Sequence, residues 1–313
     1  MPPPLITIVG PTATGKTTLS IQLAQEFSGE IISADSRQIY RGFDIGSGKV
    51  TLSEMQDIPH SMIDIRDPWE GFSVAEFQQE ANDHIQDILS REHHPILVGG
   101  TGLYIDAIIR GYTIPEVQPN LALRAKLEAK SLEQLQQMYQ AVCPNETLNS
   151  SDFQNPVRLI RTIEKSLAGL STSPTDQQNQ QDTAYTPIII GLTADTTTLR
   201  SRIEERVIQR LEAGAIEEVE SLYQLLQEQL SPTEATKKLS SFGLGTRAIL
   251  EYLNGDITMA QLTSKYITKE YQYAKRQLTW FKRAADIHWI DVLDSDVYAQ
   301  AEQIIKKISI ANL

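Results

Sequence analysis

The sequence predicts an α/β protein in which a parallel sheet is flanked by helices and carries a helical insertion domain. Three observations lead to this prediction. Short apolar segments alternate with segments of helical periodicity along the first part of the chain. A glycine-rich loop separates the first apolar segment from the first helical one. From residue 113 to residue 186 this alternation stops, and the sequence is helical or polar throughout.

The first strand, loop and helix are placed by residue types alone. Residues 5–9 are apolar and β-branched, and residues 17–27 follow with helical periodicity. A capping box formed by Ser73 and Glu76 marks the start of a later helix. Strands that alternate with helices predict a parallel sheet with ligands at the carboxyl ends of its strands. The further elements expected here are strands over 30–34 and 95–98 and a helix over 73–91.

The middle of the chain differs from its two ends. Residues 120–170 are rich in Gln and Leu and contain no strand pattern, and residues 171–186 are polar, which indicates a loop. A strand pattern returns over 187–193. We therefore divide the chain into a core of residues 1–112 and 187–313 and a helical insertion domain of residues 113–186. The remaining helices are expected over 197–230, 246–253 and 259–283.

The composition is that of a globular protein, with 41% hydrophobic and 22% charged residues. Cys143 is the only cysteine, which excludes an intramolecular disulfide and a cysteine-rich zinc site. The N-terminus has no basic segment followed by an apolar stretch, and no apolar run reaches the length of about 18 residues that a membrane span needs. We expect a cytoplasmic protein that has no membrane partner and is a monomer.

The charge of the chain is unevenly distributed. The formal net charge of −12 argues against nucleic acid as a partner, because such partners are bound through Lys and Arg. Residues 237–283, however, contain nine Lys or Arg and three acidic residues. A basic surface can therefore exist on this acidic protein.

Residues 10–17, GPTATGKT, match the Walker A spacing and lie between a strand and a helix. Glycines let backbone N–H groups face phosphate oxygens, Lys16 adds a positive charge, and Thr17 can hold Mg²⁺. The core is therefore P-loop NTPase-like, and the ligand carries phosphate or diphosphate groups. A glycine turn without a ligand is the alternative interpretation. The predicted contacts are Gly10, Pro11, Thr12, Ala13, Thr14, Gly15, Lys16 and Thr17.

Two other strand ends carry functional residue types. Asp35 follows the second strand, which places its carboxylate at the same sheet edge as the P-loop, as a base or a magnesium ligand. Residues 99–104, GGTGLY, follow the third strand, where paired glycines allow the backbone to approach a ligand closely and Thr101 can donate a hydrogen bond. A solvated acid and a packing turn are the structural alternatives at these two places.

Five motifs occur together in one order along nearly the whole chain. They are GPTATGKT (10–17), DSRQIYRGFDIG (35–46), PHSMIDI (59–65), GGTGLY (99–104) and AKRQLTWFKR (274–283). In this combination the chain resembles the tRNA dimethylallyltransferases, also called tRNA isopentenyltransferases. The P-loop alone is shared by many unrelated enzymes, whereas the combination is specific to this family.

The resemblance implies transfer of a dimethylallyl group from dimethylallyl diphosphate to N6 of adenosine-37, beside the anticodon of tRNA, with Mg²⁺ as cofactor. The P-loop then holds a prenyl diphosphate, and Thr17 is the expected metal ligand. Asp35 matches the base proposed for the family. Thr12, Lys16 and Thr101 complete the predicted catalytic residues, and Arg202 and Arg206 are expected to face the diphosphate.

The resemblance also implies contacts with tRNA. Residues next to Asp35 are where the acceptor adenine is expected to be read, and Gln38 suits an adenine edge because an amide both donates and accepts. Helix 259–283 presents a basic face that an ordinary solvated helix would also show. The predicted tRNA contacts are Asp35, Ser36, Arg37, Gln38, Thr101, Arg124, Arg158, Arg161, Lys265, Lys269 and Arg276.

Three other functions share some of these features. An adenylate isopentenyltransferase, which acts on free AMP, ADP or ATP, has a similar P-loop and base, but the insertion and the basic C-terminal helix favour tRNA. A P-loop kinase or NTPase would use Asp35 with metal or water, but the AKRQLTW motif has no evident role in one. A non-catalytic RNA-binding module would not need the complete set of Lys16, Thr17 and Asp35.

Overall fold

The computed structural model describes residues 2–111, 120–144, 148–169, 184–294 and 296–311. The chain forms two compact units. The core unit is Met1–Ile109 with Ala184–Leu313, and the insertion unit is Arg110–Thr183. These boundaries lie three residues before those expected from the sequence, at 113 and 186.

A six-stranded sheet forms the centre of the core unit, with all neighbouring strands parallel and the order β3-β2-β4-β1-β5-β6. The predicted α/β class with a parallel sheet is confirmed. The strand with the P-loop, β1, lies between β4 and β5, so that loops from both sides reach it. The strands are β1 (Pro4–Val9), β2 (Gly29–Ser33), β3 (His60–Ser61), β4 (His94–Gly99), β5 (Thr186–Thr193) and β6 (Ile287–Asp291), and β3 and β6 were not predicted.

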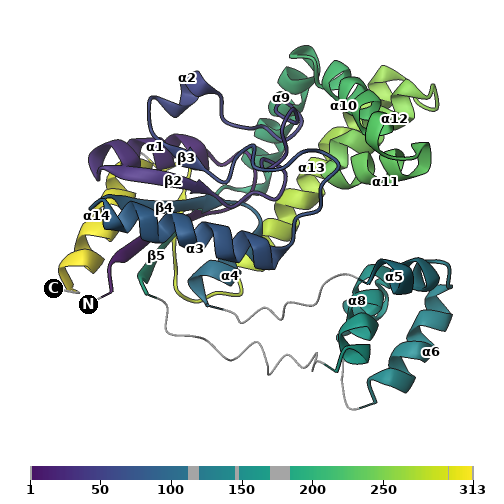
Figure 1. Ribbon diagram of the computed structural model, residues 1–313. Helices are drawn as coiled ribbons and strands as arrows, with labels where there is room; N and C mark the ends of the chain where they lie inside the picture. Colours follow the sequence, from purple (N-terminus) through teal and green to yellow (C-terminus); the bar gives the residue numbers. More distant parts are fainter. Residues whose placement is uncertain (1, 112–119, 145–147, 170–183, 295, 312–313) are drawn as a thin grey trace. The chain divides into compact units, whose positions relative to one another are not determined.

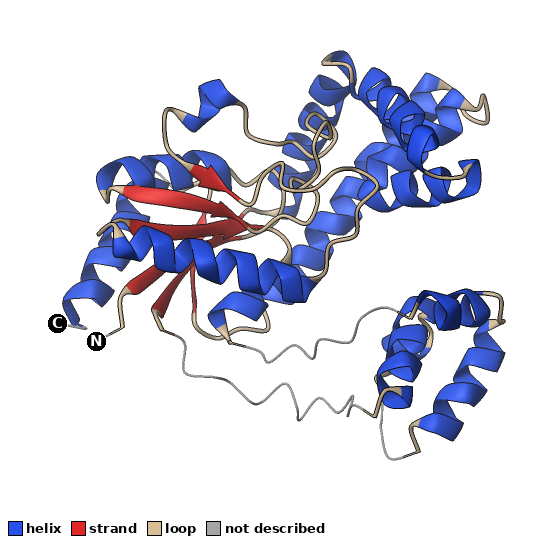
Figure 2. Ribbon diagram, in the orientation of Figure 1, coloured by secondary structure: helices blue, strands red, loops and turns tan. Residues whose placement is uncertain are grey.

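Helices cover both faces of this sheet, as Figure 2 shows. On one face, α1 (Lys16–Glu26) and α14 (Val297–Ala311) pack against alternate strand residues such as Ile8 and Ile190. On the other face, α3 (Val74–Ser90) and α4 (Gly102–Ile109) pack against Leu5 and Leu97. The predicted capping box at the start of α3 is confirmed, and α4 and α14 were not predicted.

A second cluster of helices lies beside the sheet, at the carboxyl ends of its strands (Figure 1). One helix, α13, joins the two parts, because its Ala274 is buried in the helical cluster and its Phe281 in the core beside the sheet. The helix predicted over 197–230 is wrong as a single element: it is divided at Gly214, whose φ of 100° is left-handed. The helices are α9 (Thr196–Glu212), α10 (Ala215–Gln229), α11 (Pro232–Phe242), α12 (Leu244–Leu253) and α13 (Met259–Phe281).

The long connection between β2 and α3 packs against the helical cluster before it enters the sheet as β3. Phe43 of this connection is buried against Phe242, and the only helix in it is the short α2 (Leu52–Met55). Lys49 donates to the carbonyl of Tyr40 and pairs with Asp44 and Asp64. The connection therefore has a defined path, which brings residues 46–48 to the functional site described below.

The insertion unit has its own small core, which includes Leu135, Leu159 and Ile163. Its described residues are helical and contain no strand. The polar loop predicted over 171–186 lies almost entirely outside the described residues. Throughout the described parts of both units, no helix has the length and apolar character of a membrane span. The helices of the unit are α5 (Leu121–Glu128), α6 (Leu132–Val142), α7 (Ser150–Phe153) and α8 (Pro156–Leu167).

Candidate active site

The P-loop is held in shape by its own backbone and by Lys16. The Nζ atom of Lys16 donates to the carbonyl oxygens of Gly10 at 2.9 Å and of Pro11 at 2.7 Å. Gly10 has no room for a side chain, since a Cβ would lie 2.5 Å from the carbonyl oxygen of Leu192. Gly15 adopts a left-handed conformation at the start of α1. The loop therefore has the glycine-dependent geometry that the Walker A pattern predicts.

A cavity of about 470 Å³ lies over this loop, at the carboxyl ends of β1, β2 and β4. It brings together most of the predicted site residues, which come from three separate segments of the core unit. The predicted residues that line it are Thr12, Ala13, Thr14, Gly15, Lys16, Thr17, Asp35, Arg37, Gln38, Arg202 and Arg206.

Asp35 and Thr101 lie side by side because β2 and β4 are neighbours in the sheet. Asp35 Oδ1 accepts a hydrogen bond of 2.9 Å from the backbone N–H of Arg37. Thr101 Oγ1 accepts one of 3.1 Å from the backbone N–H of Ser36. The approach needs Gly99, because a Cβ there would lie 2.1 Å from the carbonyl oxygen of Ala34. The glycines after β4 thus place Thr101 against the segment that carries Asp35.

Thr12 is held by side chains from two helices. Arg206 Nη1 of α9 donates to Thr12 Oγ1 at 2.8 Å. The backbone N–H of Thr12 donates to Oε1 of Gln277 on α13 at 2.9 Å, and Gln277 Nε2 donates to the carbonyl oxygen of Gly100, also at 2.9 Å. The amide of Gln277 therefore joins the P-loop to the glycine-rich end of β4.

The cavity is electropositive next to the P-loop. Burial and, to a smaller extent, the charge of Arg206 lower the pKa of Lys16 to about 7, although the charge of Asp35 opposes both effects. Burial also lowers the pKa of Arg206 to about 10, together with the nearby charge of Arg210. Cations that are held close together away from water are stabilised by an anion between them. The site is therefore suited to a phosphate or diphosphate group.

The family model described as IPP transferase matches residues 38–284 of the chain. A tRNA dimethylallyltransferase of Bacillus cytotoxicus is 38% identical over 307 residues, which cover 96% of this chain and 94% of that protein. A protein named tRNA dimethylallyltransferase 2, from Shewanella sediminis, is 38% identical over 96% of this chain and 97% of its own length. The chain belongs to the IPP transferase family. The resemblance found in the motifs is thus confirmed.

Solved structures of the IPP transferase family have the same fold. The tRNA isopentenylpyrophosphate transferase of Bacillus halodurans matches 99% of this chain and 96% of its own, with a TM-score of 0.70 and 35% identity. A eukaryotic dimethylallyltransferase, described as acting on tRNA, matches 99% of this chain and 80% of its own, with a TM-score of 0.79 and 26% identity.

Three predicted tRNA contacts of this IPP transferase lie in the insertion unit and have acidic partners there. Arg124 donates to both carboxylate oxygens of the buried Glu164, at 3.0 and 2.7 Å, and Arg161 donates to the same carboxylate at 2.5 Å. Arg158 is exposed and pairs with Asp152. These ion pairs give Arg124 and Arg161 a part in holding the unit together, and contact with tRNA stays a prediction for all three arginines.

The predicted basic residues of α13 have different surroundings. Lys265 pairs with Glu251, Lys269 is half-buried, and Arg276 is exposed. The guanidinium of Arg276 lies 5.7 Å from the ring centre of Tyr273, and that of Arg37 lies 5.1 Å from it. Arg276 therefore lies next to Tyr273, a side chain that lines the cavity.

Several residues of the cavity wall were not among the predicted site residues. Those on α9 and α13 include Arg210, Glu270, Tyr273 and Gln277. A signal for Arg210 was present, because it continues the four-residue spacing of Arg202 and Arg206 along one helix face. Gln277 lies within the AKRQLTW motif, but no local pattern shows that its side chain reaches the P-loop.

Proposed function

We propose that this IPP transferase moves a dimethylallyl group from dimethylallyl diphosphate to the exocyclic N6 of an adenine beside the anticodon of tRNA. The supporting observation is that the P-loop and Asp35 line the same cavity. One end of the cavity suits a diphosphate, and the other offers a base. The products are an N6-isopentenyladenosine in tRNA and free diphosphate.

The P-loop end binds the donor. Lys16, Arg202 and Arg206 line this end, and they stabilise the negative charge that grows on the diphosphate as its bond to the allylic carbon breaks. The electron pair of that carbon–oxygen bond leaves with the diphosphate. Each such electrostatic contact is worth roughly 3 kcal/mol in the transition state.

The residues also suit a magnesium ion with the donor. Thr17 presents a hydroxyl oxygen to the cavity, and oxygen atoms are the ligands that Mg²⁺ prefers. Mg²⁺ commonly binds through one or two protein ligands together with phosphate oxygens and water. This agrees with the described residues, which contain no group of three or more metal-ligating side chains. When bound, the ion neutralises part of the diphosphate charge.

Asp35 acts at the acceptor. The N6 amino group is a weak nucleophile, because its lone pair is delocalised into the purine ring. A base that takes a proton from N6 while the new carbon–nitrogen bond forms lowers the barrier and raises the rate by a factor of about 10²–10⁴. The hydrogen bond from the N–H of Arg37 orients the Asp35 carboxylate, and Thr101 beside it supplies a hydroxyl for the acceptor.

The proposal includes a monomeric enzyme that acts in the cytoplasm on tRNA. The predicted tRNA contacts beside the cavity are Ser36, Arg37, Gln38 and Arg276.

The test is a Mg²⁺-dependent assay with radiolabelled dimethylallyl diphosphate and with unmodified tRNA, AMP and ATP as separate acceptors. We expect label in tRNA alone, and a decrease of about 10²–10⁴ in the rate for Asp35→Asn. Label in free nucleotides would assign the chain to the adenylate enzymes instead. No label in any acceptor, with ATP hydrolysed, would refute prenyl transfer.

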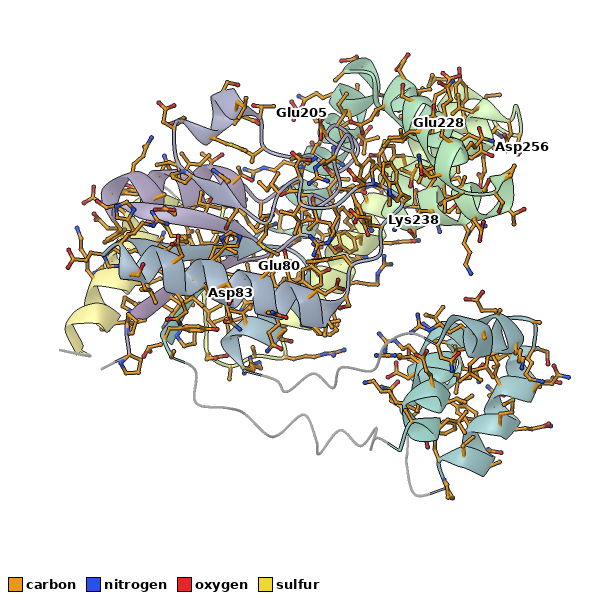
Figure 3. The ribbon with its side chains drawn as sticks, viewed as in Figure 1. Glu80, Asp83, Glu205, Glu228, Lys238 and Asp256 are labelled. Atoms are coloured by element: carbon orange, nitrogen blue, oxygen red, sulfur yellow. The ribbon has the colours of Figure 1, made fainter. Side chains whose placement is uncertain are left out.

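The control for Asp35→Asn is the same substitution at an exposed aspartate of the core unit. Asp83 on α3 serves this purpose, since its side chain points away from the sheet into solvent (Figure 3). Asp83→Asn is expected to keep the wild-type rate. Asp35→Asn should still bind inorganic pyrophosphate, because the P-loop end of the cavity is unchanged.

A further inference from the structure

One wall of the cavity is formed by a loop that contains no catalytic residue. Residues 46–48 of the connection between β2 and α3 line the same cavity as the P-loop. Gly48 has a φ of 63° and lies directly against two guanidinium groups: a Cβ would come within 2.3 Å of Arg206 and 2.1 Å of Arg210. The position of this loop therefore limits where Arg206 can lie.

The loop is held by a single carboxylate. Glu218, which is half-buried near the start of α10, accepts hydrogen bonds from three successive backbone N–H groups. Oε2 accepts from Asp44 and Ile45, both at 2.7 Å, and Oε1 accepts from Gly46 at 2.8 Å. Successive N–H groups that converge in this way form an anion-binding nest, which the protein fills with its own side chain.

The position of Glu218 in the chain connects this nest to the donor site. Arg206 is on α9, and α10 follows it directly after the turn at Gly214. The loop is thus fixed at one end by a carboxylate of α10 and touches at the other end a guanidinium of α9. We propose that Glu218 is a positioning residue for donor binding: it holds residues 44–46 so that Gly48 packs against Arg206 and keeps that arginine on the diphosphate. This inference rests on the proposed function only in naming the donor.

The test is Glu218→Gln, which keeps the shape of the side chain. The glutamine oxygen can still accept, but its NH₂ group faces an N–H group and cannot accept from it. We expect the KM for dimethylallyl diphosphate and the Kd for inorganic pyrophosphate to rise about tenfold, equivalent to one charge-assisted hydrogen bond. The KM for tRNA should stay unchanged, and kcat should change less than about twofold.

The matched control is Glu228→Gln, at an exposed glutamate near the other end of α10 (Figure 3). This substitution is expected to leave the KM for dimethylallyl diphosphate and the Kd for pyrophosphate at their wild-type values. Gly48→Ala disturbs the same contact from the loop and should also weaken pyrophosphate binding. Thermal unfolding of each variant shows whether the fold is retained.

Two results would overturn the inference. One is an unchanged pyrophosphate Kd in a folded Glu218→Gln variant. The other is an equal rise in the KM values for dimethylallyl diphosphate and for tRNA, because this would indicate general damage to the fold. Pyrophosphate binding needs no transfer reaction, so an enzyme that binds pyrophosphate but transfers no label would refute the proposed function and leave this test intact.

Discussion

At the scale of single residues, Lys16 has the most unusual environment in the site. Its Nζ atom donates hydrogen bonds to two carbonyl oxygens of the P-loop itself. Burial is the main reason why its pKa is about 7 instead of 10.5. Lys16 is therefore partly neutral near neutral pH. A diphosphate placed beside it favours the charged form and raises its pKa again.

This leads to a prediction about protons. At about pH 8 most Lys16 side chains in the free enzyme are neutral, so that binding of pyrophosphate should take up a proton at this group. At about pH 6 Lys16 is already charged and contributes no uptake. The affinity for pyrophosphate should therefore fall as the pH rises above 7, by up to about tenfold per pH unit. Calorimetry in two buffers of different ionisation enthalpy measures the uptake.

Lys16→Arg is the comparison for this experiment. Arginine stays protonated at both pH values, so the variant should lose the uptake due to residue 16 and keep any due to pyrophosphate itself. Equal uptake by wild type and variant at about pH 8 would mean that Lys16 is charged before the ligand arrives.

At the scale of elements, the sequence predicted those helices, strands and loops whose signatures lie within a few neighbouring residues. The P-loop, the strands beside it and the capping box of α3 all have signatures within a few residues. The strand β3 has only two residues and so carries no pattern of its own, whereas the Ile and Trp residues of β6 form a short β-type run that was not predicted as a strand. The division at Gly214 interrupts an apolar period that otherwise runs on, and the glycine was the only sign of it.

The same limit applies to the site. Asp35 and Thr101 were each expected at the ligand-binding edge of the sheet, because parallel strands end there. That they lie together follows from the pairing of β2 with β4, which the sequence did not indicate. The contacts of Gln277 with Thr12 and Gly100 join residues separated by 265 and 177 positions. Such contacts depend on how helices pack against the sheet, which neither periodicity nor motif spacing specifies. Glu218 is a further example, since its partners lie in a loop without regular structure.

The element α13 provides the next prediction, through Gln277. Its buried amide accepts from one backbone group and donates to another, and a carboxylate can only accept. Gln277→Glu would bring a carboxylate oxygen against the carbonyl oxygen of Gly100. We expect a loss of about 1–3 kcal/mol in the free energy of unfolding, measured with denaturant, and weaker donor binding. Gln272→Glu, on the exposed side of the same helix, should change neither, and equal effects of both substitutions would contradict this role.

At the scale of the whole molecule, the two units have separate cores and different sources of stability. The core unit contains three large apolar clusters, whereas the insertion unit has one small cluster and a buried carboxylate. Burial raises the pKa of Glu164, but hydrogen bonds from Arg124, Arg161 and the backbone of Asn120 outweigh it and hold the pKa at about 2. Ion pairs to a buried carboxylate therefore support the small apolar cluster of the insertion unit.

Glu164→Gln should unfold the insertion unit and spare the core. It leaves two arginines without their carboxylate, and breaking a buried ion pair in this way costs about 3–5 kcal/mol. Hydrogen exchange read by segment should speed up in α5 and α8 and stay unchanged in α1 and α3. In the wild type the same stability is present above pH 4.5, the ordinary value for Glu, and is lost as the pH falls towards 2. Glu133→Gln, exposed on α6, is the control, and faster exchange in both units would show that they do not unfold independently.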